Sequence, residues 1–291
     1  MKEVNTCHNK NFNMIYPYKN AWKYIEEIQQ SENADHQALW NQYLIEPYWD
    51  KISEWAPVAC EFMKPKPIKN IEALKQQLLI LDTIDFERIQ QEFIKISQAL
   101  PIYDDDPITV AIYPIDDDDS IVKERQNGVV GACVFGNIIM HVNPLAQDYI
   151  EWIPYVFAHE YHHTVWGHNW YVLKGGLKGS LLEHLINEGE ADTFAKHMYP
   201  HLNPSWVSNI SKEEQRKAWA KIKPVLDSTD RNVHAQYVFG SEALDLPWCI
   251  GYYFGYTFIN SFLDHNPEIS LNDLLDMHPN DIFTRSGWAN K

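Results

Sequence analysis

Cysteine is scarce in this chain of 291 residues. The four cysteines, Cys7, Cys60, Cys133 and Cys249, stand far apart, and none of them forms a Cys-x-x-Cys pair. Scattered cysteines of this kind exclude a disulfide framework and a cysteine-based structural zinc site. We therefore expect reduced thiols that are mostly buried.

Basic residues are also in short supply. The chain has 24 lysines and arginines against 40 aspartates and glutamates, which gives a net charge of −16 and a pI of about 5.2. An acidic surface repels phosphate groups, so the composition argues against nucleic acid as a partner. An anionic membrane surface is disfavoured for the same reason.

Long hydrophobic runs are missing as well. The segment Met1 to His8 has no apolar stretch of the kind found in signal peptides, so we expect a cytoplasmic protein without one. The most apolar segment, residues 246–263, contains Thr257, Asn260 and Ser261 and is at the lower length limit for crossing a bilayer. It is better interpreted as a buried core helix, and no membrane partner is expected.

What remains is ordinary globular composition, with 45% apolar and 22% charged residues. Apolar residues recur at three- and four-residue spacing through much of the first hundred positions, and prolines separate the segments. The pattern predicts a helical N-terminal lobe over residues 1–104, without catalytic spacing, and helices over residues 21–30, 36–49, 71–81 and 84–99.

The pattern changes after Pro101. A β-branched segment at residues 107–115 predicts a strand, and Gly136-Asn137 predicts a tight turn between two more strands over 129–135 and 138–142. The acidic runs Asp104–Asp106 and Asp116–Asp119 are expected to be solvated loops, since the second lacks the glycine turn of a calcium loop. Helical periodicity then returns over residues 149–166, 181–198, 213–226 and 247–263. The order predicts an α+β fold, mostly helical, with a second domain over residues 105–291.

The most informative segment is His159-Glu160-Tyr161-His162-His163, which contains the pattern His-Glu-x-x-His. Residues four apart share one helical face, so the imidazoles of His159 and His163 can converge on one metal ion. Glu160 lies near the ion and can take a proton from metal-bound water. The preceding residues are apolar, which predicts a buried helix whose polar side chains need partners.

A catalytic zinc site takes a third protein ligand. In Asn187-Glu188-Gly189-Glu190-Ala191-Asp192, the carboxylates of Glu188 and Asp192 share one helical face. This spacing favours Glu188 as the ligand, with Asp192 accepting the outer N–H of a zinc-bound histidine. Glu190 faces roughly the opposite side and stays an alternative ligand.

Another zinc protease pattern requires a glycine three residues and a histidine six residues after the second histidine. Those positions hold Trp166 and Asn169, so the extended pattern fails. His168 is one position away from the required place and is a weak candidate for the third ligand. His162 lacks the paired spacing and is expected either to support a metal ligand from outside or to be a packing residue.

These two motifs resemble the YjaZ-like predicted zinc-dependent proteases, a family of the gluzincin type with a thermolysin-like core. The similarity covers roughly residues 105–285. Besides the two motifs, it includes the strand over 108–115, the segment over 131–144 and the Gly-Tyr-rich segment over 247–256. The resemblance implies a zincin-like metallopeptidase domain.

The resemblance further implies His159, His163 and Glu188 as ligands of Zn²⁺ and Glu160 as the general base. It also suggests that the strand over 138–142 forms the edge of the cleft, where an extended peptide could add by main-chain hydrogen bonds. A donor to the oxyanion is expected as well. Tyr252 leads because it belongs to the Gly-Tyr segment, and the alternatives are Tyr256, His234 and Arg231.

The sequence therefore predicts a zinc metallopeptidase that acts on a peptide or protein substrate. The alternative is a non-catalytic, zinc-stabilised protein that binds peptides or proteins, a role that 11 tryptophans would suit. Zinc-dependent hydrolysis of a small amide is a third hypothesis. The sequence indicates neither the cleavage specificity nor the oligomeric state.

Overall fold

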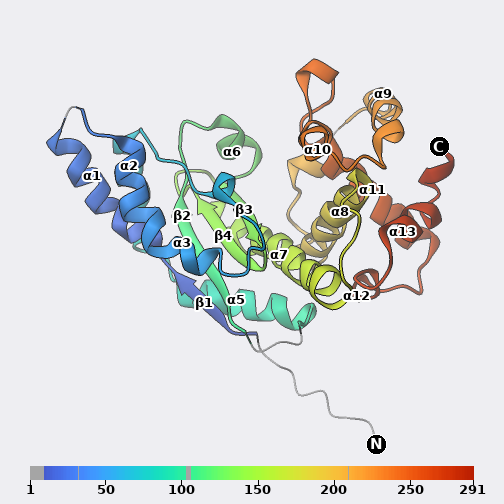
Figure 1. Cartoon of the computed structure of the whole chain (residues 1–291), viewed down its shortest axis with the longest axis horizontal. Helices are drawn as coiled ribbons and strands as arrows, with labels where there is room; N and C mark the ends of the chain where they lie inside the picture. Colours follow the sequence, from blue (N-terminus) through green and yellow to red (C-terminus); the bar gives the residue numbers. More distant parts are fainter. Residues whose placement is uncertain (1–9, 32, 103–105, 209) are drawn as a thin grey trace, which may run out of the picture. The chain divides into compact units, whose positions relative to one another are not determined.

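The computed structural model describes residues 10–31, 33–102, 106–208 and 210–291 (Figure 1). Its contacts divide the chain into two compact units, one that ends at Val165 and one that spans Trp166–Lys291. Helices dominate and there is one small mixed sheet, which confirms the predicted α+β class. The predictions for Cys7, Asp104 and Asp105 lie outside the described residues.

The sheet belongs to the first unit and has the order β1-β2-β4-β3. β1 pairs parallel with β2, β2 pairs parallel with β4, and only β3 runs antiparallel to its neighbour. The four strands are β1 (Phe12–Ile15), β2 (Ile108–Pro114), β3 (Val129–Val134) and β4 (Asn137–Val142).

The suggestion that the strand over 138–142 forms an edge is wrong. β4 is hydrogen-bonded to β2 on one side and to β3 on the other. Within the described residues, β3 is the edge strand beside β4 and pairs with no other strand. The reason is that β4 pairs with β2, so β3, its partner in the hairpin, takes the outer position.

In the described part of the first unit, helices α1 to α7 accompany this sheet, and side-chain caps begin several of them. The side chains of Asn70 and Asp85 accept hydrogen bonds from the first turns of α4 and α5, as Asp119 does for α6. The helices are α1 (Ala21–Gln30), α2 (His36–Trp40), α3 (Glu46–Ile52), α4 (Ile71–Leu81), α5 (Phe86–Ala99), α6 (Ser120–Arg125) and α7 (Tyr149–Gly167). A π-helical turn, Asn41–Ile45, joins α2 to α3.

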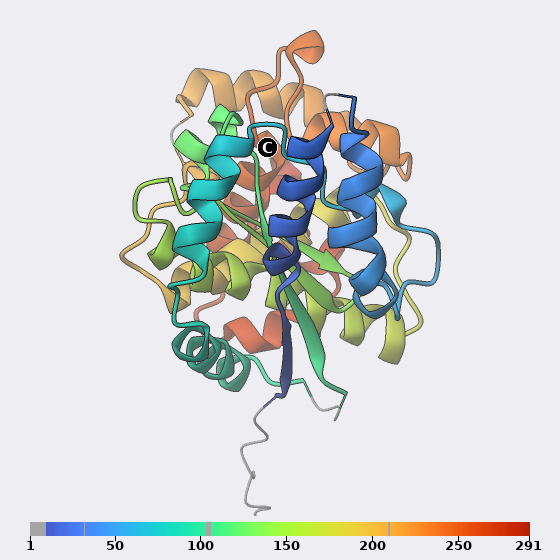
Figure 2. The ribbon, with the colours of Figure 1, turned by 90° about the vertical axis from the view of Figure 1, so that its left-hand side faces the viewer.

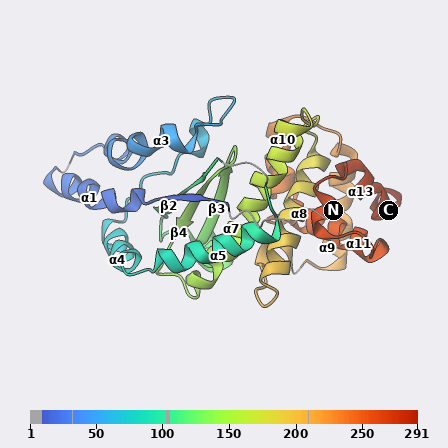
Figure 3. The same cartoon turned by 90° about the horizontal axis from the view of Figure 1, so that it is seen from below.

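The two faces of the sheet carry different helices (Figures 2 and 3). On one face, the Tyr113 hydroxyl of β2 donates to the Leu44 carbonyl, just before α3, at 2.9 Å. On the other face, Phe93 of α5 stacks on Phe157 of α7 with ring centroids 3.6 Å apart, and Phe12 of β1 packs edge-on against both. The helix that carries the His-Glu-x-x-His pattern is thereby held against the sheet by aromatic packing.

The boundary expected between residues 104 and 105 falls inside the first unit. The reason is β1, which the sequence analysis missed: this strand of four residues pairs with β2 and ties the N-terminal segment into the sheet. A separate role for residues 1–104 stays a prediction.

A half-buried histidine in β4 is expected to make the first unit sensitive to acid. Burial lowers the pKa of His141 from 6.5 to about 4, against a smaller opposing effect of its hydrogen bond to the Pro114 carbonyl. Because the folded protein disfavours the charged ring, stability is complete above pH 6.5 and falls as the pH drops toward 4.

We expect the free energy of unfolding to fall by about 2 kcal/mol from this group between pH 6.5 and 5. Urea titrations at several pH values measure it, with His141→Gln as the control that cannot titrate. Equal pH dependence in both proteins would contradict the assignment.

The second unit is helical. Its helices are α8 (Leu181–Met198), α9 (Lys212–Ile222), α10 (Arg231–Val238), α11 (Ile250–His265), α12 (Leu271–Leu274) and α13 (Pro279–Arg285). A capping box of Ser180 and Glu183 begins α8. The core is aromatic, and Trp219, Phe258 and Trp288 meet with ring centroids between 5.5 and 5.6 Å apart.

Helices α8 and α11 touch through their backbones. A Cβ added at Gly189 would lie 2.2 Å from the carbonyl group of Gly255, and one at Gly255 would lie 2.0 Å from the Leu185 oxygen. Only glycine allows this approach, and it brings α8 against α11 beside Glu188.

We therefore expect Gly189→Ala to destabilise the second unit by about 2–3 kcal/mol, because backbone cannot give way as a side chain can. Urea unfolding measures this, with Gly167→Ala as the control, since a Cβ at Gly167 meets nothing within 4 Å. A Gly189→Ala protein as stable as the wild type would disprove the packing argument.

Three other sequence predictions can be compared with the structure. Most of the apolar segment over 246–263 lies in α11, and one side of this helix is buried. No described helix is both long and apolar enough to cross a membrane. Cys60, Cys133 and Cys249 form no disulfide among the described residues. In the run Asp116–Asp119, the carboxylate of Asp117 binds Lys123 and Asn143, while that of Asp119 caps α6.

Candidate metal centre

Helix α7 carries the first part of the candidate site. His159 and Glu160 are buried, each with 7% of its surface exposed, and His163 is partly buried. One turn of helix separates the two histidines, so their rings meet edge to face and the Nε2 atoms lie 3.0 Å apart. Both rings thus present a nitrogen to the same point.

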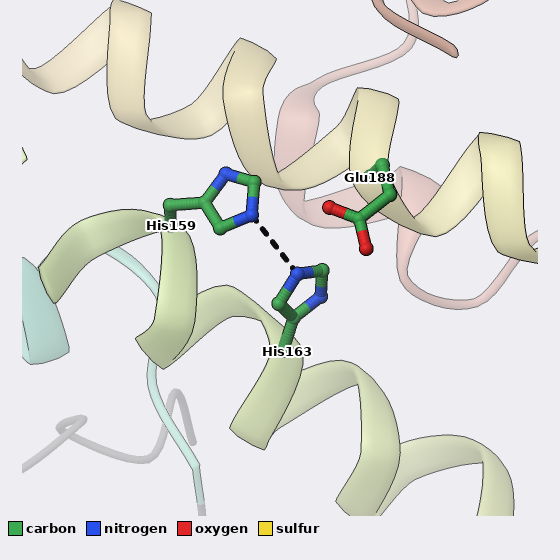
Figure 4. A group of neighbouring side chains, drawn as sticks. All are labelled: His159, His163 and Glu188. Carbon is green, nitrogen blue, oxygen red and sulfur yellow. Dashed lines mark hydrogen bonds between the residues drawn. The ribbon is translucent and has the colours of Figure 1, made fainter. Parts of the chain in front are cut away.

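Helix α8 carries the carboxylate. His159, His163 and Glu188 form a group whose ligand atoms all lie within 4.8 Å of one another. Figure 4 shows the Glu188 carboxylate beside the facing imidazoles. The structure therefore brings together the three residues that the sequence predicts as ligands.

The donor set fits a zinc ion. Two imidazole nitrogens and one carboxylate oxygen are the protein ligands of a common class of catalytic zinc sites. Zn–N bonds of about 2.0–2.1 Å in tetrahedral geometry place two nitrogens about 3.3 Å apart. The 3.0 Å between the two Nε2 atoms is close to that spacing, so a small outward movement of the rings accommodates the ion.

Glu160 lies directly over the edge strand. A Cβ added at Gly131 of β3 would lie 2.3 Å from Cγ of Glu160 and 2.6 Å from its Oε1. The absence of a side chain at Gly131 therefore makes the space in which the Glu160 carboxylate sits. Sequence analysis did not give Gly131 this role, and only the strand register reveals it.

Thr164, the residue after His163, ties α7 to the hairpin. Its hydroxyl lies 3.1 Å from the Gly136 carbonyl and 3.3 Å from the Glu160 carbonyl, and Cys133 Sγ lies 3.5 Å away. These contacts fix the strand relative to the helix turn that carries Glu160 and His163. Nothing in the sequence pattern distinguishes Thr164 from an ordinary helical threonine.

Glu188 has a histidine neighbour on its own helix. His184 Nε2 lies 3.3 Å from Glu188 Oε1, one turn earlier on α8. The ring of His234 lies 5.8 Å from that of His184, and its Nε2 donates to the Ser228 carbonyl at 2.7 Å. His234, one of the candidate oxyanion donors, therefore lies next to His184, which in turn contacts Glu188.

Asp192 is fully buried and is held by a residue that the sequence analysis did not consider. The Trp206 indole donates to its Oδ1 at 2.9 Å. Burial of the Tyr256 hydroxyl raises the pKa of Tyr256, and the negative charge of Asp192 raises it further. The predicted bond from a ligand histidine to Asp192 stays a prediction.

The remaining candidates lie elsewhere in the second unit. Tyr252 is half-buried in the first turn of α11, with its ring 5.9 Å from that of Phe239. Arg231 begins α10, and its charge lowers the pKa of Tyr171 against the stronger effect of burial. A role for Tyr252 as oxyanion donor stays a prediction.

Glu190 and His168, the alternative ligands, do not belong to the group that the structure forms from described residues. Glu190 is buried, and burial raises the pKa of its carboxyl well above the usual value. His162 is also buried, as expected for a packing residue, with its ring 6.3 Å from that of His163.

Comparison with known proteins identifies the family of this chain. Residues 86–284 match the model of a family described as "Predicted Zn-dependent protease (DUF2268)". The chain is also 28% identical over 171 residues to the uncharacterized protein YjfC of Bacillus subtilis (strain 168). That match covers 54% of this chain and 56% of YjfC, so it spans little more than half of either protein.

No solved structure matches the chain. The family match, however, covers most of the sequence, including the helices that carry His159, His163 and Glu188. It agrees with the resemblance to YjaZ-like proteases. The chain belongs to the family of predicted zinc-dependent proteases.

Proposed function

We propose that this protein is a zinc metallopeptidase of the zincin type. The observation that carries the proposal is the convergence of His159, His163 and Glu188, with the Glu160 carboxylate on the same helix turn as the histidines. A ligand set of two histidines and one glutamate leaves room for water or substrate at a zinc ion. The family description supports the same reaction.

His159, His163 and Glu188 would hold the ion. Bound zinc acts as a Lewis acid and lowers the pKa of water at the ion to about 7. The Glu160 carboxylate would accept the proton of the attacking water and deliver it to the nitrogen of the leaving amine. Burial of Glu160 against Gly131 keeps that carboxylate in one position, which is what proton transfer requires.

The outer side of β3 is the place for an extended substrate. Within the described residues, its main-chain groups on that side face no other strand. A peptide that pairs with β3 would add a fifth strand to the sheet by main-chain hydrogen bonds. Because Gly131 of β3 lies under Glu160, such a peptide passes the general base.

A donor to the developing oxyanion completes the proposal. His234 and Tyr256 are the stronger candidates on structural grounds, because His234 adjoins His184 beside Glu188 and Tyr256 lies near Asp192. Tyr252, which the family resemblance favours, is the third candidate for this donor.

The experiment is cleavage of a diverse peptide library by the zinc-loaded protein, with products identified by mass spectrometry. Cleavage that disappears on chelation and returns with zinc is the expected result. Tight zinc binding without cleavage of any peptide would overturn the proposal in favour of a zinc-stabilised binding protein. Cleavage of small amides alone would shift it to another hydrolase class.

A further inference from the structure

The tip of the β3–β4 hairpin is unusual. The turn was expected at Gly136-Asn137, but Val134 pairs with Asn137, so the two loop residues are Phe135 and Gly136. Both have positive φ, 51° at Phe135 and 117° at Gly136. Two-residue hairpin loops of this kind favour Asn-Gly, and a bulky side chain at positive φ is a genuine outlier.

Phe135 is also exposed. Its surface is 41% accessible, although it is a large apolar residue in a strained position. Folding alone would favour asparagine there, both for the backbone and for the solvent. Strained residues that persist in exposed loops are concentrated at ligand sites, so this outlier indicates a function.

A second exposed aromatic side chain covers the next residue. The ring of Trp55, 38% exposed, packs on Gly136, where an added Cβ would lie 2.8 Å from it. The turn itself is held from behind by Thr164 of α7. The hairpin tip thus carries two exposed aromatic side chains, Phe135 in the turn and Trp55 over Gly136, which together we call the tip surface.

The tip surface lies at the end of the edge strand β3, whose Gly131 lies against Glu160. Phe135 follows Gly131 by four residues, which is about 13 Å at the rise of a β-strand. A peptide paired with β3 advances at the same rate, so its residue at the tip surface lies about three to five positions from the bond beside Glu160.

We propose that the tip surface is a specificity subsite, a statement that rests on the proposed peptidase function. It selects extended peptides that carry an aromatic or large aliphatic side chain three to five residues from the cleaved bond. Burying such a side chain against exposed aromatic rings supplies the preference, and the fixed hairpin supplies the spacing.

The test compares cleavage profiles of a peptide library for the wild type, Phe135→Asn and Leu79→Asn. Leu79 is an exposed apolar residue on α4 and serves as the matched control. In the wild type we expect an aromatic residue at one such position to raise kcat/KM about tenfold over alanine. Phe135→Asn should reduce this ratio to about one or two, whereas Leu79→Asn should keep it.

Folding and specificity can be separated in this variant. Asparagine suits the turn, so the melting temperature of Phe135→Asn should stay within about 2 °C of the wild type. A cleavage profile with no preference beyond the residues next to the bond, or one that Phe135→Asn leaves unchanged, would overturn the subsite.

A second readout needs no hydrolysis. In zinc-free Glu160→Gln protein, phenylalanine-containing peptides should slow hydrogen exchange over residues 129–135 more than alanine-containing ones, and Phe135→Asn should abolish the difference. If zinc-loaded wild type cleaves nothing, the peptidase proposal fails, and this readout alone decides whether the tip surface binds peptides. A dimer that Phe135→Asn converts to a monomer would assign the surface to a second copy and overturn the subsite.

Discussion

Glu160→Gln is expected to abolish peptide hydrolysis and leave zinc bound. Glutamine has nearly the same shape, so it can occupy the space over Gly131, but its amide cannot accept the proton of the attacking water. General base catalysis contributes about 10²–10⁴-fold to a rate. We therefore expect kcat to fall about 10³-fold, which corresponds to about 4 kcal/mol of transition-state stabilisation.

The measurement is kcat on the best library peptide, with zinc content and melting temperature determined on the same preparations. Glu151→Gln is the matched control, because Glu151 is an exposed glutamate in the first turn of the same helix. Substantial activity in Glu160→Gln with zinc in place would remove Glu160 from the mechanism.

Gly131→Ala tests the position of the base rather than its chemistry. The new Cβ would lie 2.3 Å from Cγ of Glu160, so one of the two must move. The atoms it meets belong to a flexible side chain, so the fold should accept the methyl group while the carboxylate is displaced. A displacement of about 1 Å can cost about 10²-fold in rate, and we expect a loss of kcat of that size.

Metal content and the free energy of unfolding should change little in Gly131→Ala. Gly167→Ala adds the same methyl group near the end of α7, where nothing lies within 4 Å, and should keep full activity. If Gly131→Ala is as active as the wild type, Glu160 does not act from the position seen over β3.

Much of the fold follows from local signals. α1, α4 and α8 begin and end at the predicted residues. α1 has strongly one-sided apolar spacing, and the capping residues Asn70 and Ser180 mark where α4 and α8 begin. β1 was missed, since four residues carry too little pattern to distinguish a strand. The suggestion that the strand over 138–142 forms an edge was also wrong, because the sequence of a single strand does not determine which strands pair with it.

Some residues of the candidate site could likewise be predicted from the sequence, and others could not. The residues on α7 and α8 were predictable, since the four-residue spacing of His159 and His163 is itself the geometry of the site. Gly131 and Trp206 were not, because their importance comes from tertiary contacts with Glu160 and Asp192, respectively. His184 was overlooked, although it stands four residues before Glu188 on the same helix. The Gly189–Gly255 contact belongs to this second group.

The central claim is that His159, His163 and Glu188 hold one zinc ion for hydrolysis. Zinc per chain, measured by mass spectrometry after reconstitution and dialysis, tests it most directly in the wild type, Glu188→Ala and the exposed control Glu213→Ala. We predict about one zinc in the wild type and the control, and a large loss in Glu188→Ala, because two histidines alone hold zinc weakly. Full retention in Glu188→Ala would contradict this ligand set, and a wild type that binds no zinc would contradict the account as a whole.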